Sequence, residues 1–239
     1  MKTFDDYLEN IYHQDNKLVF DYSKHDDFNL KLRKIPYSSS SKRLLGHTVH
    51  TLYTLTAKET SILRALKGEG DSIIEDSDLE YFASRSASYA FKVLPTTEID
   101  YILYSQNSYP LMDKFLNKLR NKFSSQVLKL SPSILKTSTD KLSLRDSIPA
   151  KYKDQAETLL LKLKQKDSIK LRNDIPKHLR MFFKGFITID ESILAKVENK
   201  NILIVDDILT VGTTFNQLFG LLQNYNPKNV YGLTLFKFR

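Results

Sequence analysis

The sequence predicts an α/β fold in which helices flank a central, mostly parallel β-sheet. Residues 202–205 form an apolar, β-branched run typical of a buried parallel strand, and a Gly/Thr-rich turn and a helical pattern follow it. A strand–helix–strand pattern occurs twice, over residues 99–130 and 202–236. Repeats of this kind build a parallel sheet through right-handed crossovers.

Shorter elements are expected ahead of this core. A helix over residues 57–67 begins after Thr56, which can cap it, and ends before Gly68. A second helix is expected over residues 78–91. His47 and His50 would share one face if they were helical, although no third metal ligand accompanies them. The remaining expectations are a helix at 4–11, strands at 18–20 and 30–32, and a polar loop at 38–41.

The core is expected to begin with a strand at residues 99–104. Residues 105–108 form the loop that follows, and a helix over 110–123 opens with proline, which suits the first helical position. Tyr104 and Tyr109 flank this loop, where they would either stack a base or line the edge of the core. Later elements are a strand at 126–130, a helix at 150–166, a helix at 215–223 and a strand at 230–236.

The domain organisation expected is a small α+β extension or hood over residues 1–55 and a core over residues 56–239. A basic helical insertion interrupts the core at about 131–184. With 239 residues, 41% of them hydrophobic, the chain can bury a sizeable core. The absence of cysteine excludes a disulfide framework, a thiol nucleophile and a cysteine-bound zinc. Without a signal sequence or a long apolar stretch, the expected location is the cytoplasm.

The net charge of +8 is concentrated in the insertion region. Residues 114–184 hold 18 Lys and Arg against six acids, a net +12. Nucleic-acid binding, a polyphosphate substrate or a solvated helical face would each explain it. Arg172, Lys177 and Arg180 lie off the regular helix, so they are the better candidates for cations of a lid over a bound anion.

The most informative stretch follows the apolar run at 202–205, where Asp206 and Asp207 precede a turn over residues 210–214. Ligands of open α/β sheets bind beyond the carboxyl ends of the strands. Backbone N–H groups at the start of the next helix suit a phosphate, and the two carboxylates suit vicinal hydroxyls. This arrangement predicts a site for a ribose phosphate.

Two other interpretations compete with this site. A receiver domain also has an acidic pair after an apolar strand, but it needs about 100 residues after that pair, and only 32 follow Asp207. A purely structural strand would hardly select two adjacent carboxylates, because their repulsion costs stability.

The stretch 202–214 resembles the signature with which type I phosphoribosyltransferases hold phosphoribosyl pyrophosphate (PRPP). It departs from the signature at Val211, where many members carry threonine. The resemblance implies a Rossmann-like fold, Mg²⁺ as cofactor, catalytic roles for Asp206 and Asp207, and cytoplasmic nucleotide metabolism. The PRPP-binding residues that it implies are Asp206, Asp207, Ile208, Leu209, Thr210, Val211, Gly212, Thr213 and Thr214.

In that family the loop after the first core strand holds pyrophosphate. Carried onto this chain, the role falls to Ser105, Gln106 and Asn107, with Lys114 as the nearest cation. Magnesium would bind together with PRPP and be held by Asp206 and Asp207. Residues 62–71, 183–186 and 233–235 also look like ComF-type members associated with DNA uptake, although the zinc-ribbon cysteines of that group are missing.

The function that the resemblance implies is transfer of phosphoribosyl from PRPP to a nitrogen acceptor, such as a nucleobase, with release of pyrophosphate. The alternative is a catalytically weak PRPP- or nucleotide-binding accessory protein associated with DNA. A third hypothesis is an enzyme that transfers or hydrolyses pyrophosphate on the same scaffold. The expected partners are PRPP and a small acceptor; nucleic acid is less favoured, and a homodimer fits because family members often pair.

Overall fold

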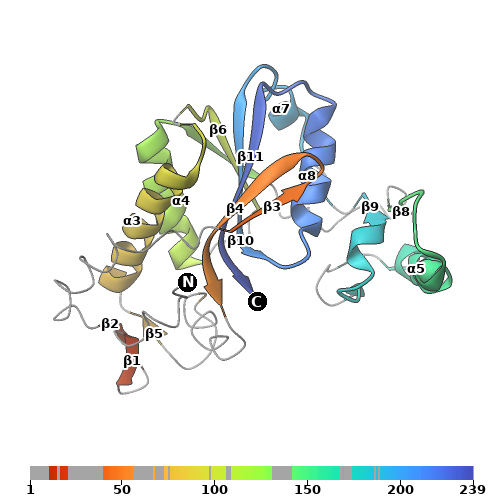
Figure 1. Ribbon diagram of the computed structural model, residues 1–239, viewed down its shortest axis with the longest axis horizontal. Coiled ribbons are helices and arrows are strands. Elements are labelled where there is room, and N and C mark those ends of the chain that lie inside the picture. The colour runs from red at the N-terminus through yellow and green to blue at the C-terminus, as the bar shows by residue number, and fades with distance from the viewer. Residues whose placement is uncertain are drawn as a thin grey trace.

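A computed structural model describes residues 11–14, 17–20, 40–55, 67, 73–74, 76–96, 98–105, 109–130, 142–166, 169, 174–185, 187 and 189–238. Its centre is a six-stranded sheet of order β3-β4-β11-β10-β6-β7, in which only β3 runs antiparallel to its neighbour (Figure 1). The strands are β3 (Ser40–Leu44), β4 (His47–Leu55), β6 (Tyr101–Ser105), β7 (Gln126–Leu130), β10 (Asn201–Leu209) and β11 (Asn229–Phe238). The predicted class, a mostly parallel sheet flanked by helices, is confirmed.

Helices cover both faces of this sheet. On one face lie α3 (Asp76–Val93) and α4 (Pro110–Phe123), and on the other lies α8 (Thr213–Gln223) (Figure 1). The remaining helices are α5 (Ala150–Lys164), η6 (Arg180–Phe182) and α7 (Glu191–Leu194). Two small sheets complete the described structure: β1 (Ile11–Gln14) with β2 (Lys17–Phe20) and β5 (Ile73–Ile74), and β8 (Ser143–Leu144) with β9 (Phe183–Lys184).

Alternating strand faces divide the core into two hydrophobic clusters. Leu203 and Val205 of β10 point to the α3–α4 side, whereas Ile202 and Ile204 point to the α8 side. All four are almost fully buried, as a central parallel strand requires. The insertion packs into the α8-side cluster through Ala156 and Leu163 of α5, among others, so it shares a core with the sheet.

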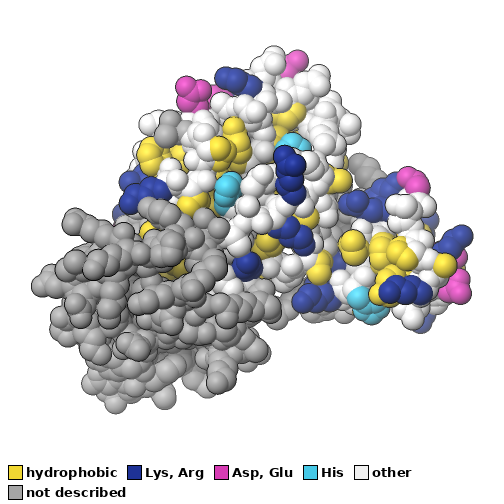
Figure 2. Space-filling model, in the orientation of Figure 1, with side chains coloured by type: hydrophobic (Ala, Val, Ile, Leu, Met, Phe, Trp, Pro, Cys, Tyr) yellow, Lys and Arg dark blue, Asp and Glu magenta, His cyan; other side chains and the backbone are white. Residues whose placement is uncertain are grey.

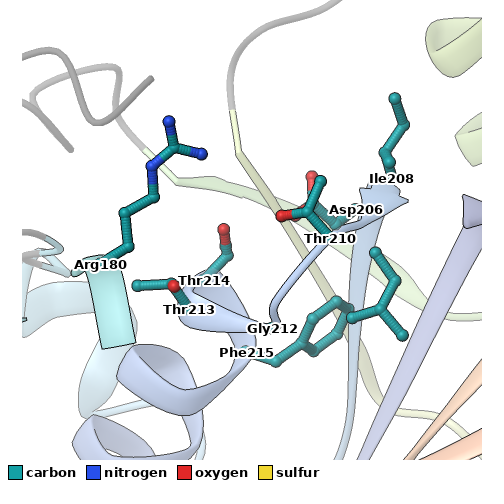
Figure 3. A pocket seen from close by; sticks show the side chains of 9 residues that line it. Arg180, Asp206, Ile208, Thr210, Gly212, Thr213, Thr214 and Phe215 are labelled. Atoms are coloured by element: carbon teal, nitrogen blue, oxygen red, sulfur yellow. The ribbon is translucent and has the colours of Figure 1, made fainter. Parts of the chain in front are cut away.

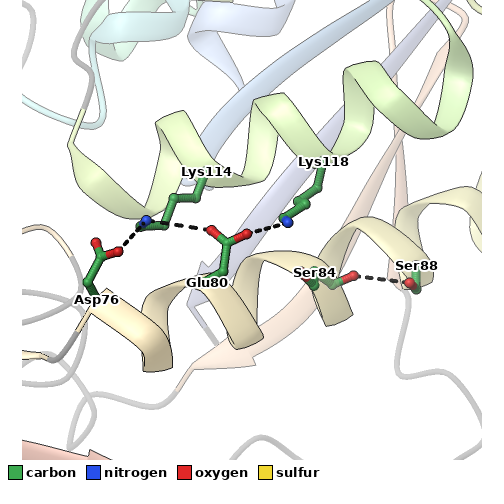
Figure 4. Close-up of polar contacts among 6 residues, drawn as sticks. All are labelled: Asp76, Glu80, Ser84, Ser88, Lys114 and Lys118. Carbon is green, nitrogen blue, oxygen red and sulfur yellow. Dashed lines mark hydrogen bonds and ion pairs between the residues drawn. The ribbon is translucent and has the colours of Figure 1, made fainter.

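Ion pairs join the amino-terminal turns of the helices α3 and α4 (Figure 4). Lys114 Nζ lies 2.9 Å from Asp76 Oδ2 and 3.5 Å from Glu80 Oε2, and Lys118 pairs with the other oxygen of Glu80. These side chains are partly to largely exposed, so the pairs orient the helices more than they stabilise them. Lys114 is therefore engaged with α3.

Most elements of the core occur where the sequence predicts them. The helix expected at 110–123 is α4, the strand at 126–130 is β7, and the helix at 150–166 is α5, two residues shorter. The other matches are α3 for 78–91, β6 for 99–104, α8 for 215–223, β11 for 230–236 and β2 for 18–20.

One expectation near the amino-terminal side is wrong, and the condition for a shared histidine face is not met. Ser40 and Ser41 belong to β3, where the sequence indicated a polar loop. His47 and His50 lie on a strand, so they do not share a face; His47 instead stacks on Phe219 of α8 with ring centroids 4.5 Å apart. Residues 4–10 of the helix expected at 4–11 lie outside the described residues, and its last residue, Ile11, begins the strand β1. The expected residues at 30–32, 38–39 and 57–66 also lie outside the described residues.

The six-stranded sheet draws on residues from both sides of the division expected at residue 56. β4 pairs in parallel with β11, and the buried hydroxyls of Thr51 and Thr234 lie 3.0 Å apart across that pairing. The division of the chain at this point remains a prediction. Among the described residues, the helices are too short or too polar for any of them to cross a membrane.

We expect Gly232→Ala to lower the free energy of unfolding by about 1–3 kcal/mol. A Cβ there would lie 2.7 Å from Val49 Cγ2 and 2.9 Å from Phe215 Cε1, which closely packed neighbours cannot easily relieve. Gly220→Ala is the matched control, because a Cβ on that helical residue meets nothing within 4 Å. It should raise stability by about 0.5–1 kcal/mol. Urea unfolding measures both, and equal effects would contradict the packing argument.

Candidate functional site

The sheet has its topological switch point between β10 and β6. These strands are parallel neighbours, with Val205 opposite Tyr104. From β6 the chain passes through α4 to β7, and from β10 it passes through α8 to β11 in the opposite direction and on the opposite face (Figure 1). Open α/β sheets bind ligands beyond the carboxyl ends of strands at such a point. Asp206 and Ser105 are the next residues along these two strands, so the predicted acids and the first residue of the predicted loop lie at this point.

The turn between β10 and α8 depends on Gly212. Its φ of 87° is a left-handed conformation that side chains disfavour, and a Cβ would lie 2.5 Å from Leu44 Cδ1. Lys42 of β3 also donates a hydrogen bond to the carbonyl of Val211, at 3.3 Å. With this turn fixed, α8 begins directly at Thr213, and its first backbone N–H groups form the kind of helix terminus that favours an anion.

A small pocket of about 30 Å³ lies at this helix terminus (Figure 3). Thr213 is only 5% exposed, and its buried Oγ1 has no hydrogen-bond partner among the described residues. A buried polar atom without a partner is costly, so it indicates a missing polar ligand. The pocket is lined by Arg180, Asp206, Ile208, Leu209, Thr210, Gly212, Thr213, Thr214 and Phe215.

Asp206 is a carboxylate in an unfavourable environment. Burial, and secondly the charge of Asp207, raise its pKa to about 8. Two groups favour its ionised form: the N–H of Asp207, which donates to Asp206 Oδ1 at 2.9 Å, and the positive charge of Lys67. A group whose pKa is shifted this far by burial and by a specific neighbour is a candidate for function.

Asp207 faces a different set of groups. It forms an ion pair with Lys67, whose side chain is only 17% exposed and whose Nζ lies 5.4 Å from the ring centroid of Tyr109. The Tyr109 hydroxyl is buried without a hydrogen-bond partner among the described residues, and burial followed by the nearby charge of Asp207 raises its pKa. Lys67 is thus the counter-ion of the acidic pair, a role that the sequence did not reveal.

Several predicted site residues come together in the structure. Asp206 and Thr210 line the pocket with Thr213 and Thr214, and Arg180 reaches it from the insertion. Lys177 is exposed. The contacts of Lys114 with α3 give no support to its predicted pyrophosphate role. Ser105 ends β6, while Gln106, Asn107 and Arg172 lie outside the described residues.

The two tyrosines beside the predicted loop differ. Tyr104 is 2% exposed and belongs to the core, so it cannot stack a base without rearrangement. Tyr109 is half-buried and contacts Lys67.

A broader hollow of about 700 Å³ lies at the opposite, amino-terminal end of the strands. Two of its charged groups pair with each other: Asp100 lies 3.5 Å from Lys200, and it also accepts from the N–H of Asn201 at 2.8 Å. Because ligands of such sheets bind at the carboxyl ends, the acidic pocket is the better candidate site.

Residues 152–237 match the family model of the phosphoribosyl transferase domain. This match includes β10, its acidic pair and α8, and it confirms over that part of the chain the resemblance to phosphoribosyltransferases.

Solved structures of hypoxanthine-guanine and hypoxanthine phosphoribosyltransferases are similar to this chain. They include an enzyme from Bacillus anthracis (15% identity, 68% of each chain covered, TM-score 0.35) and one from Staphylococcus aureus (15%, 68% of this chain and 65% of that chain, 0.36). A third is from Trypanosoma cruzi (11%, 68% of each chain, 0.33). No curated protein matches the sequence.

We expect Asp206→Asn to stabilise the protein in metal-free buffer at pH 8 by more than about 1 kcal/mol. The folded-state pKa of Asp206, about 8, lies above the ordinary value of 3.8 for an aspartate, so the wild type loses stability as the pH rises between these values. The gain from the substitution should therefore be full above pH 8 and absent below pH 4. Unfolding curves at pH 4, 6 and 8 measure it.

Asp207→Asn is the matched comparison. Because it removes the partner of Lys67, it should not raise the free energy of unfolding at pH 8. A pH-independent effect of Asp206→Asn would contradict the buried, partly protonated state of this side chain.

Proposed function

We propose that the chain transfers a phosphoribosyl group from PRPP to a nitrogen acceptor, such as a nucleobase, with release of pyrophosphate. The main support is one juxtaposition: Thr213, whose buried hydroxyl has no partner among the described residues, lines the same small pocket at the start of α8 as Asp206. A helix terminus beside a carboxylate pair fits a phosphate attached to a diol. The family match over 152–237 supports the same reaction.

Each part of the site has a role in this reaction. The turn over residues 210–214 holds the 5′-phosphate through backbone N–H groups and the hydroxyls of Thr213 and Thr214. Asp206 and Asp207 accept hydrogen bonds from the 2′- and 3′-hydroxyls of the ribose. Mg²⁺ fits this donor set, because it is commonly held by one or two carboxylates together with substrate oxygens, and when bound it would neutralise the leaving pyrophosphate.

The reaction itself is a displacement at the anomeric carbon. The lone pair of the acceptor nitrogen forms the new C–N bond, the C–O bond to pyrophosphate breaks, and its electron pair leaves with the pyrophosphate. The acceptor releases a proton. The sugar ring gains positive charge along this path, and the two carboxylates stabilise that charge electrostatically.

The double substitution Asp206→Asn with Asp207→Asn tests this assignment. It should abolish PRPP binding in the presence of Mg²⁺ while leaving the chain folded, because both hydroxyl acceptors lose their charge but keep their shape. Calorimetric titration with PRPP measures the affinity, and circular dichroism checks folding. An unchanged affinity would reject the assignment.

A second candidate function is binding without catalysis. The specific observation in its favour is the ion pair of Lys67 with Asp207, which places a protein cation on one of the two acids that the reaction requires. Lys114, the nearest cation predicted for the pyrophosphate loop, is engaged with α3. The chain would then be a PRPP- or nucleotide-sensing accessory protein.

Nucleic acid is the less favoured partner of such an accessory protein. Figure 2 shows Lys and Arg at several separate places on the described surface of this face, with Asp and Glu among them on the lobe that carries α5. Two of the basic groups of that lobe are also paired, Lys166 with Asp174 and Lys184 with Asp146. Both features are typical of a solvated surface.

Incubation of PRPP and Mg²⁺ with a panel of nucleobases, with pyrophosphate release as the readout, separates the two candidates. Release that depends on one base supports the transferase. PRPP binding without any release supports the accessory protein, and salt-sensitive binding to DNA in addition would indicate an association with DNA.

A further inference from the structure

We propose that Arg180, from the insertion, is a binding residue for the 5′-phosphate and determines specificity for a phosphorylated sugar. This inference rests on the proposed function. The sequence indicated Arg180 as a lid cation, and in the family-based assignment such cations serve the pyrophosphate. In the structure, Arg180 lines the same pocket as Thr213 and Thr214 (Figure 3). In the proposed function this pocket holds the 5′-phosphate and not the pyrophosphate.

The backbone around Arg180 is anchored on both sides. Its neighbours Leu179 and Phe182 are buried at 3% and 6% exposure, and Phe182 packs against Tyr152 of α5 with ring centroids 5.4 Å apart. The side chain is anchored too, because Nε donates to the carbonyl of Ile175 at 2.8 Å. A guanidinium group held at Nε has a defined plane, which suits the binding of phosphate oxygens by its terminal nitrogens.

The segment that carries Arg180 is fixed to the helix that forms the phosphate pocket. Gln217, one turn into α8, donates from Nε2 to the carbonyl of Phe183 at 2.6 Å and accepts from the N–H of Gly185 at 3.1 Å. Gln217 is 7% exposed, so these hydrogen bonds are shielded from water. One helix thus supplies the first-turn N–H groups and also holds the cation in position beside them.

Arg180 adds to this pocket what its other donors lack. The backbone N–H groups and the Thr213 hydroxyl are neutral, whereas a phosphate monoester carries up to two negative charges. Asp206 lies across the pocket and would repel that phosphate when ionised (Figure 3). Arg180 offsets this repulsion, so it should favour ribose 5-phosphate over ribose, and it should matter little for pyrophosphate.

Calorimetric titration of the full chain with ribose 5-phosphate, ribose and pyrophosphate, each with Mg²⁺, tests this role. Arg180→Gln should weaken ribose 5-phosphate binding by about 10- to 100-fold, since a charge-assisted hydrogen bond is lost. Arg180→Lys keeps the charge but not the planar geometry and should weaken it less. Neither variant should change the affinity for pyrophosphate. The control is Lys153→Gln, which removes one exposed positive charge from α5, away from the pocket, and should bind like the wild type.

The outcomes separate this inference from the proposed function. Wild-type affinity for ribose 5-phosphate in both Arg180 variants would overturn the role of Arg180 and leave the transferase proposal standing. A selective loss of pyrophosphate binding would also overturn it, in favour of a lid over the leaving group. If the wild-type chain itself bound no ribose 5-phosphate, both proposals would fail.

Discussion

The half-buried carboxylate pair at the end of β10 is the constraint around which the site is built. Two adjacent acids repel each other, and burial of one of them disfavours its charged form, as the raised pKa of Asp206 shows. The chain offsets this in two local ways: Lys67 pairs with Asp207, and the Asp207 N–H donates to Asp206. Neither removes the cost completely. The arrangement is therefore poorly explained by folding alone and is better explained by a ligand that brings hydroxyl groups and a cation.

The helix α8 connects the site of the acidic pair to the sheet edge and to the insertion. Its first residue follows a left-handed Gly212 that packs on Leu44 of β3, so the edge of the sheet shapes the anion site. Its second turn binds the insertion through Gln217. A shift of α8 would therefore move the phosphate pocket and the segment of Arg180 together. The insertion is therefore a structural part of the site. Its basic composition alone did not indicate this, because a solvated helical face would explain it equally well.

The sequence predicted the helices and strands whose formation depends on neighbouring residues in the chain. The apolar run at 202–205, Pro110 at a helix start and the amphipathic pattern of α5 each identify an element without any knowledge of its neighbours. No strand was predicted at β4, because His47 and His50 were considered only as a pair that one face of a helix would bring together. The roles of Lys67 and Lys42 could not be predicted, since each depends on a contact across more than 130 residues of chain.

Binding of the substrate should raise the free energy of unfolding of the chain. A ligand that binds only the folded chain stabilises it by mass action, and here it would also relieve the desolvation of Asp206 and satisfy the hydroxyl of Thr213. Lys67, which pairs with Asp207, would then also face the negative charge of the substrate. The groups that destabilise the isolated chain would thus form favourable contacts once the sugar phosphate is bound. The stability that the free protein gives up at this site would then favour binding of a ligand that satisfies those groups.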